Sequence, residues 1–304
     1  MKRERLIVKS NFDGLELVGE VFEPTAQAKG VIQFVHGMCE HKGRYEEMMT
    51  YFTANGYICV AYDQRGHGQT AKNKEDLGYF GDKTGRGIVE DAYAVTQEIK
   101  RRYPNLPVIL FGHSMGSMIV RCYLQDHDDM IDKLVVCGSP SFNPLVDVAI
   151  GLTRVLGAIK GEKHRSKTLA YMSTGRGNKN FPNEGPSAWL SRNKENREAF
   201  NKDEYCKYIF TYNGFENLFR LMKSTFAKKE YKVKNPNLPI HFVSGSDDAV
   251  LGGEDNWLKV HNLLRGVGYK NVSGKLYHGL RHEIHNEPER ETVYADLLAF
   301  IEEK

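Results

Sequence analysis

The chain has 304 residues, of which 40% are hydrophobic and 27% are charged, and this ordinary composition excludes a disordered chain and a coiled coil. Its formal net charge of +3 is too close to balance to indicate a nucleic-acid-binding protein. The sequence contains no apolar run of the roughly 18 residues that a membrane-spanning helix needs. A chain of this length can bury about 75% of its unfolded surface, so we expect it to fold without a metal or a disulfide.

The cysteines indicate whether the chain folds in a reducing or an oxidising compartment. The number of cysteines is odd, their spacings are wide, and most lie in apolar runs: Cys39, Cys59, Cys122, Cys137 and Cys206. This pattern predicts buried free thiols in a reducing environment. The basic N-terminal stretch is not followed by the apolar segment of a signal peptide. We therefore expect a soluble, cytoplasmic protein.

The first 140 residues alternate between strand-like and helix-like segments. Residues 5–10 and 15–22 alternate around an Asn-Phe-Asp-Gly turn, which is typical of a β-hairpin. Continuous apolar runs predict strands buried on both faces at residues 31–37, 57–63, 107–112 and 133–140. Helical periodicity covers residues 44–55 and 86–102, and a further helix is expected directly after residue 112.

The alternation breaks between residues 141 and 235, where helical pieces and many aromatic residues replace the buried-strand pattern. Strands are expected again at 239–245 and 272–278, and helices near 254–266 and from about residue 289. We therefore predict an α/β core formed by residues 1–140 and 236–304, with a mostly parallel sheet and helices on both faces. A helical insertion at 141–235 interrupts this core.

Residues 112–116 read Gly-His-Ser-Met-Gly, a G-x-S-x-G motif centred on Ser114. A predicted strand runs directly into the motif and a predicted helix runs directly out of it. This is the nucleophile-elbow arrangement, in which a sharp turn exposes the serine and the two glycines leave room for the turn. The alternative is an ordinary strand–turn–helix in which Ser114 only caps the helix.

A nucleophilic serine needs a base, and the base needs a carboxylate that orients it. After the predicted strand at 239–245, Asp247 and Asp248 lie on a loop, and after the next strand a second loop carries His278, His282 and His285. Catalytic groups collect at this edge of open α/β sheets, and the order serine, acid, histidine is that of the α/β-hydrolases. The pattern alone leaves open which aspartate and which histidine are used.

We expect neither a metal nor a cofactor. The string His-Glu-Ile-His at 282–285 misses the H-E-x-x-H spacing that places two imidazoles on one zinc ion. The sequence also lacks the glycine-rich motifs that bind nucleotides.

Acyl transfer also requires two N–H donors for the oxyanion. One is expected from Met115, the residue after the nucleophile, and the other from Met38, at the end of the strand at 31–37.

Five strings together resemble the monoacylglycerol lipase, lysophospholipase and serine aminopeptidase branch of the α/β-hydrolases: HGMCEHKGRY (36–45), DQRGHGQT (63–70), GHSMG (112–116), SGSDDAV (244–250) and RHEIHNE (281–287). The resemblance implies an α/β-hydrolase fold in which 141–235 is a lid. It also implies a triad of Ser114, Asp248 and His282, with Met38 and Met115 as oxyanion donors. Arg65 and His67 are interpreted as structural.

The lid is rich in aromatic residues, which suits an apolar acyl tunnel, so we expect a lipid-like ester as substrate. Its basic residues, among them Lys160, Lys163 and Lys223, suggest a transient contact with a membrane surface. The alternatives are a serine aminopeptidase, because acidic residues such as Glu184 and Asp203 could bind a substrate amine, and a non-catalytic ligand-binding protein on the same fold. The oligomeric state is left open.

Overall fold

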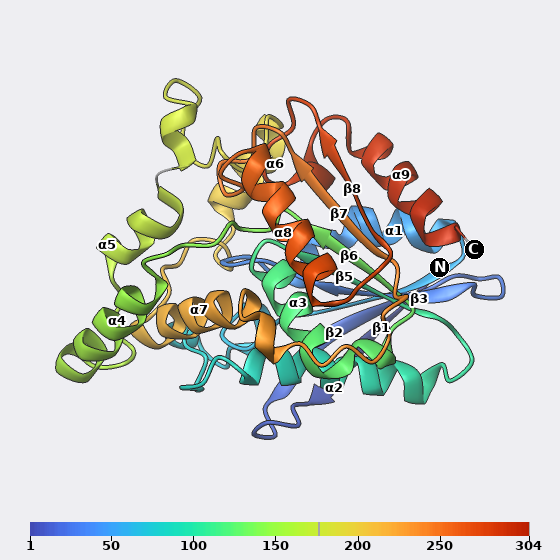
Figure 1. Ribbon diagram of the computed structural model, residues 1–304, viewed down its shortest axis with the longest axis horizontal. Helices are drawn as coiled ribbons and strands as arrows, with labels where there is room; N and C mark the ends of the chain where they lie inside the picture. Colours follow the sequence, from blue (N-terminus) through green and yellow to red (C-terminus); the bar gives the residue numbers. More distant parts are fainter. Residues whose placement is uncertain (176, 304) are drawn as a thin grey trace.

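Eight strands form one sheet in the computed structural model, which describes residues 1–175 and 177–303 (Figure 1). Their order across the sheet is β1-β2-β4-β3-β5-β6-β7-β8. The strands are β1 (Lys2–Lys9), β2 (Glu16–Glu23), β3 (Gly30–Val35), β4 (Tyr57–Tyr62), β5 (Val108–His113), β6 (Lys133–Cys137), β7 (Ile240–Gly245) and β8 (Val272–Tyr277). The strands β1, β2 and β4 pair antiparallel and all others pair parallel, so the predicted mostly parallel sheet is confirmed.

The burial of each strand explains its sequence pattern. The central strands β3, β4 and β5 are buried along their whole length, which is why they appear as continuous apolar runs. The edge strand β1 buries only alternate residues of its second half, which is why the hairpin alternates.

Helices cover both faces of the sheet, as the sequence predicts. Side chains of α2 (Gly87–Arg102), α3 (Met115–His127) and α8 (Glu254–Val267) pack in one hydrophobic cluster. Side chains of α1 (Glu46–Ala54) and α9 (Arg290–Glu302) pack in a second cluster on the other face. Two layers of helices therefore enclose the sheet and fix the positions of the loops at its carboxyl edge.

The long segment between β6 and β7 carries α4 (Val146–Lys160), α5 (Lys167–Ala170), α6 (Lys194–Lys202) and α7 (Tyr212–Thr225). In Figure 1, α4 and α5 project at the left of the molecule, on the side away from the chain ends. The helix α7 packs into the core, because Phe215 and Leu218 belong to the same hydrophobic cluster as α3, and Leu169 of α5 joins that cluster as well. Part of this segment is therefore built into the main core.

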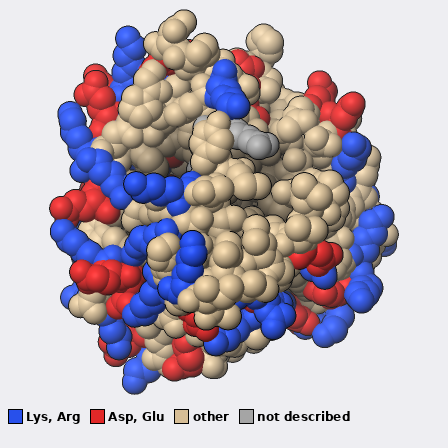
Figure 2. Space-filling model, turned by 90° about the vertical axis from the view of Figure 1, so that its left-hand side faces the viewer, with Lys and Arg blue, Asp and Glu red and all other residues tan. Residues whose placement is uncertain are grey.

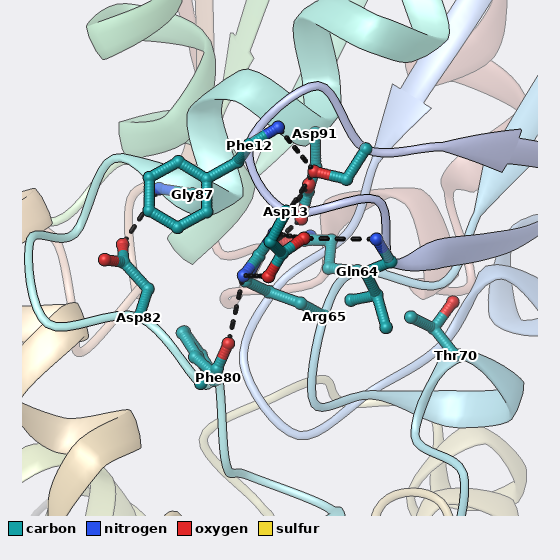
Figure 3. A network of polar contacts seen from close by, with 12 residues as sticks. Phe12, Asp13, Gln64, Arg65, Thr70, Phe80, Asp82, Gly87 and Asp91 are labelled. Carbon is teal, nitrogen blue, oxygen red and sulfur yellow. Dashed lines mark hydrogen bonds and ion pairs between the residues drawn. The ribbon is translucent and has the colours of Figure 1, made fainter.

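Arg65 fastens the loop after β4 to the rest of the molecule (Figure 3). Its buried guanidinium lies 2.6 Å from the carboxylate of Asp91 on α2 and 3.1 Å from that of Asp13 in the β1–β2 turn. It also donates to the carbonyl oxygen of Phe80 over 3.1 Å. These contacts join three segments that are distant in sequence, which agrees with the structural role expected for Arg65.

Candidate active site

Ser114 lies at the sharp turn between β5 and α3, with φ 54° and ψ −117°. A positive φ is strained for a residue with a side chain and is common at functional sites. The positions two before and two after Ser114 must be glycine, because a side chain would not fit there. A Cβ at Gly112 would lie 2.5 Å from the carbonyl oxygen of Gly116, and a Cβ at Gly116 would lie 2.0 Å from that of Val35. The Ser114 side chain makes no capping hydrogen bond to the described residues of α3, so helix capping does not explain the serine.

Asp248 and His282 are brought together from the loops after β7 and β8. Nδ1 of His282 lies 2.9 and 3.0 Å from the two carboxylate oxygens of Asp248, and both residues are buried. The carboxylate also accepts the backbone N–H of Val250 over 2.8 Å and the hydroxyl of Ser244 over 3.2 Å. These bonds fix the face that the carboxylate turns to the imidazole.

The other candidates on these two loops point elsewhere. Asp247 is exposed and accepts a hydrogen bond from Ser246 over 2.9 Å. His278 is exposed as well. His285 is buried and stacks on Tyr45, with ring centroids 5.1 Å apart. The tertiary structure thus selects one aspartate and one histidine as the pair at the sheet edge.

The pKa values of this pair shift in opposite directions. Burial by itself would lower the pKa of His282, but the adjacent Asp248 carboxylate raises it above the usual value. Burial would raise the pKa of Asp248, but His282 and the Val250 N–H hold it below the usual value. The charged carboxylate therefore favours a protonated ring, which is what a general base needs when it takes a proton.

Met38 and Met115 line one cavity together with Ser114 and His282. The turn that carries Met38 is held by Glu40, whose buried carboxylate accepts the backbone N–H of Gly37 and the Tyr45 hydroxyl. The two turns that carry Met38 and Met115 therefore border the same cavity as the serine.

Glu40 and Arg44 are site residues that the sequence analysis missed. Glu40 contacts His113 over 3.2 Å and Arg44 over 3.1 Å, and these two partners hold its pKa well below the usual value although burial would raise it. Arg44 also binds both carboxylate oxygens of Glu283, over 2.5 and 2.7 Å. The sequence contained a signal for Glu40, because this acidic residue stands three positions after Gly37, in the loop that follows a predicted buried strand.

The cavity has a volume of about 480 Å³ and is lined by charged and by apolar side chains, which we call its polar part and its apolar part. Its polar part contains Glu40, Arg44 and Glu283. Its apolar part is formed mostly by side chains of the segment between β6 and β7, including Leu145, Val148, Leu152, Leu169, Met172, Leu218, Phe219 and Met222. The cavity therefore suits an amphipathic molecule, with its reacting carbonyl group near Ser114.

Two groups of described residues bring metal-ligating atoms within 4.8 Å of one another. In the first group, His113 already uses both ring nitrogens, for Glu40 and for the carbonyl oxygen of His282. In the second group, His41 uses both ring nitrogens, for Asp203 and for the N–H of Gly43. We assign no metal to either group.

The chain was compared with known proteins. The family model described as "Serine aminopeptidase, S33" matches residues 26–289. The monoacylglycerol lipase of Mycolicibacterium smegmatis is 28% identical over 95% of this chain and 93% of its own, and phospholipase YtpA of Bacillus subtilis is 24% identical over 90% and 95%. A thermostable carboxyl esterase from Bacillus coagulans, solved with glycerol, superposes with a TM-score of 0.90 at 26% identity, over 99% of this chain and 98% of its own. A soluble variant of the Saccharomyces cerevisiae monoglyceride lipase supports the fold alone, with a TM-score of 0.74 at 19% identity, over 99% and 96%.

Within the described residues, the helices are all too short or too polar to cross a membrane.

Proposed function

The chain belongs to the serine aminopeptidase S33 family of hydrolases, and on this premise we propose that it hydrolyses lipid-like carboxylic esters through an acyl-enzyme on Ser114. The named relatives that support the ester assignment are monoacylglycerol lipases, a phospholipase and a carboxyl esterase. The single observation that carries the proposal is the amphipathic cavity, which Ser114 and His282 line together.

Each residue has one role in the proposed mechanism. The Ser114 oxygen attacks the ester carbonyl carbon while Nε2 of His282 takes the hydroxyl proton. Asp248 orients the ring and stabilises its cationic form. The N–H groups of Met38 and Met115 stabilise the oxyanion, and the alcohol then leaves with the proton that His282 carries. Water, activated in the same way, cleaves the acyl-enzyme and releases the acid.

The two parts of the cavity match the two parts of such an ester. The apolar part, which includes Leu152, Phe219 and Met222, accepts the acyl chain. The polar part, formed by Glu40, Arg44 and Glu283, is suited to hydroxyl groups of the alcohol. Monoesters of a small polyol and lysophospholipids are therefore the favoured substrate classes.

Aminopeptidase activity is the second candidate, since the family is named for it. An aminopeptidase needs a free carboxylate for the substrate's amine. The carboxylates among the described cavity residues, Glu40 and Glu283, are both bound to Arg44. Asp203, which lies elsewhere in the segment between β6 and β7, pairs with His41, and Glu204 pairs with Lys74. This charge pairing favours the ester.

The segment at 141–235 is proposed as a cap over the core, which residues 1–140 and 236–304 form. The helix α4 supports a transient contact between the cap and a membrane surface. Val148, Leu152, Val155 and Ile159 recur at helical spacing, and 48–73% of their surface is exposed. In Figure 2, which faces this side, uncharged side chains cover the centre, and Lys and Arg side chains, with Asp and Glu among them, surround it and reach inward on the left.

Charge contributes less to this contact than the sequence suggests. Lys163 pairs with Asp76, and Lys223 pairs with Asp147, so part of the basic charge of the cap is already neutralised. We therefore expect the protein to sediment with phosphatidylcholine vesicles nearly as well as with anionic vesicles. The double variant V155S/I159S should lower the affinity at least tenfold, because several buried CH₂ groups at ~0.8 kcal/mol each are lost. Binding only to anionic vesicles, unchanged in this variant, would contradict the assignment to α4.

A cytoplasmic location is proposed on the five cysteines, all of which are free thiols.

A fluorophosphonate tests the covalent chemistry. It should add one adduct to the wild-type protein, on Ser114, and none to S114A. A series of p-nitrophenyl esters tests the substrate class. Here kcat/KM should rise by up to about fourfold per methylene until the apolar part of the cavity is full. Faster cleavage of aminoacyl arylamides than of any ester would favour the aminopeptidase instead.

A further inference from the structure

Arg281, the residue before His282, is bound by a short part of the cap that we call the strap, residues 181–192. Its guanidinium lies 2.7 and 2.9 Å from the two carboxylate oxygens of Glu184. It also donates to the carbonyl oxygen of Ala188 over 2.8 Å and lies over the ring of Phe181, 3.7 Å from the centroid. Only 7% of the Arg281 side chain is exposed, so the strap encloses it almost completely.

The residues after His282 are bound to the strap as well. The backbone N–H of Glu283 donates to the carbonyl oxygen of Leu190 over 2.7 Å. The buried carboxylate of Glu287 accepts the N–H of Arg281 on one oxygen, and the N–H of Arg192 and the Ser191 hydroxyl on the other. The histidine loop is therefore hydrogen-bonded to the strap on both sides of the catalytic ring.

The strap also touches the ring itself. The Trp189 ring lies 5.0 Å from the His282 ring, centroid to centroid, at an interplanar angle of 35°. On the core side, His113 Nε2 lies 3.2 Å from the carbonyl oxygen of His282, and Asp248 holds Nδ1. The core thus holds His282 at its backbone carbonyl group and at Nδ1 of its ring. The strap contacts one face of the ring and holds the residues on either side of His282 in the chain.

We propose that Arg281 is a positioning residue for the hydrolytic reaction. Its fork-shaped pairing with Glu184 anchors the histidine loop to the strap and so keeps the His282 imidazole in the orientation that bonds Asp248. The strap is accordingly a fixed part of the catalytic machinery, and motion that admits substrate comes from other parts of the cap. This inference rests on the proposed function, because it takes His282 as the general base.

Misplacing a catalytic group by about 1 Å can cost about a hundredfold in rate. We therefore expect R281M to lower kcat by roughly 10- to 100-fold, with KM changed less than threefold. E184Q keeps the shape of the pair but removes its charge, so it should lower kcat in the same direction by less. R281K keeps the charge without the fork and should lie between wild type and R281M.

Two further readouts separate positioning from general structural damage. The rate per active site is obtained by titrating each variant with a fluorophosphonate, so that unfolded molecules are not counted. The pH dependence of kcat/KM reports the pKa of His282 in the free enzyme. Losing the Arg281 cation would raise that pKa through charge alone, whereas a weaker contact with Asp248 lowers it. We expect it to fall in R281M.

The matched control is R220M. It removes an arginine that binds Glu216 within α7, where the two side chains are 28% and 13% exposed, away from the histidine loop. Its kcat per titrated site and its pH profile should stay at the wild-type values.

The outcomes are distinct. A wild-type protein that is not labelled on Ser114 would overturn the proposed function, and the inference with it. Wild-type labelling together with an unchanged kcat per site in both R281M and E184Q would overturn the inference alone. A loss of kcat accompanied by a rise in the pKa of His282 would also overturn it, because the effect would then be one of charge and not of position.

Discussion

Replacing Asp248 by asparagine changes the hydrogen bonding at His282, the proposed general base. One carboxylate oxygen of Asp248 accepts the N–H of Val250 over 2.8 Å, and only an oxygen can fill that place. The amide NH₂ of the variant must then occupy the other position, which faces Ser244 and Nδ1 of His282. Nδ1 of His282 then faces both the NH₂ group, at the position 2.9 Å away, and the remaining oxygen, at the position 3.0 Å away; where it accepts from the NH₂ group, the proton of the neutral ring lies on Nε2.

A ring protonated on Nε2 cannot take the proton of Ser114. The corresponding change in the Ser-His-Asp proteases lowers kcat about 10⁴-fold through the same wrong tautomer. At ~1.36 kcal/mol per factor of ten, this is about 5 kcal/mol of lost transition-state stabilisation. We expect a loss of similar size in D248N, with the fold retained, because asparagine has nearly the same volume as aspartate.

The assay is hydrolysis of a p-nitrophenyl ester, together with the rate of fluorophosphonate labelling at Ser114, which needs no substrate binding beyond the reactive group. D247N is the control. Asp247 is exposed and bonded only to Ser246 among the described side chains, so its replacement should change kcat less than threefold. A D248N protein that keeps more than a tenth of the wild-type kcat, or equal losses in both variants, would refute the tautomer argument.

Two paired variants and two pH profiles extend the test. G245A should lower the melting temperature and reduce kcat more than a hundredfold, because its Cβ would lie 2.0 Å from the carbonyl oxygen of Leu280 and push the histidine loop off β7. G151A in α4 has no atom within 4 Å of the added Cβ and should instead stabilise the protein by up to about 1 kcal/mol in chemical denaturation; a loss of stability there would contradict the described packing. The acidic limb of kcat/KM should have its midpoint above 6.5, because Asp248 raises the pKa of His282 and the ring acts as a base only when neutral. Burial lowers the pKa of His261 to about 3, so the stability that depends on its neutral ring is present above pH 6.5 and is lost as the pH falls toward 3. In H261Q the free energy of unfolding should fall less steeply over that pH range. An unchanged slope would contradict the lowered pKa of His261.

Local patterns of the sequence were sufficient for the strands and for the elbow. A parallel strand buried on both faces is mostly apolar, so its pattern is complete within six residues, as in β3 and β5. The requirement for Gly112 arises within the turn, from the carbonyl oxygen of Gly116, whereas the requirement for Gly116 comes from Val35 on the neighbouring strand β3. The helical segment that interrupts the strand–helix alternation predicted an insertion at 141–235 in the same way.

Local patterns could not show which residues distant in the sequence contact one another. The residues alone left two aspartates and three histidines open, and the resemblance to a family was needed to favour Asp248 and His282. The lysines of the cap suggested a basic surface, but acidic residues from other segments pair with Lys163, Lys232 and Lys234. A periodic pattern in the sequence indicates whether a position is buried, but it does not indicate which charged residue contacts that position in the folded chain.

The strap is the clearest case of contacts that local sequence patterns could not predict. Arg281 and Glu184 are 97 residues apart, and neither lies in a periodic segment. Arg44 joins Glu283 across 239 positions in the same way, at the polar part of the cavity. The sequence by itself determined which residues form the elements and the loops that carry Ser114, Asp248 and His282, because those depend on neighbours along the chain. Only the tertiary structure decided which charges meet there, because an ion pair needs two groups within about 4 Å in space, whatever their distance in sequence.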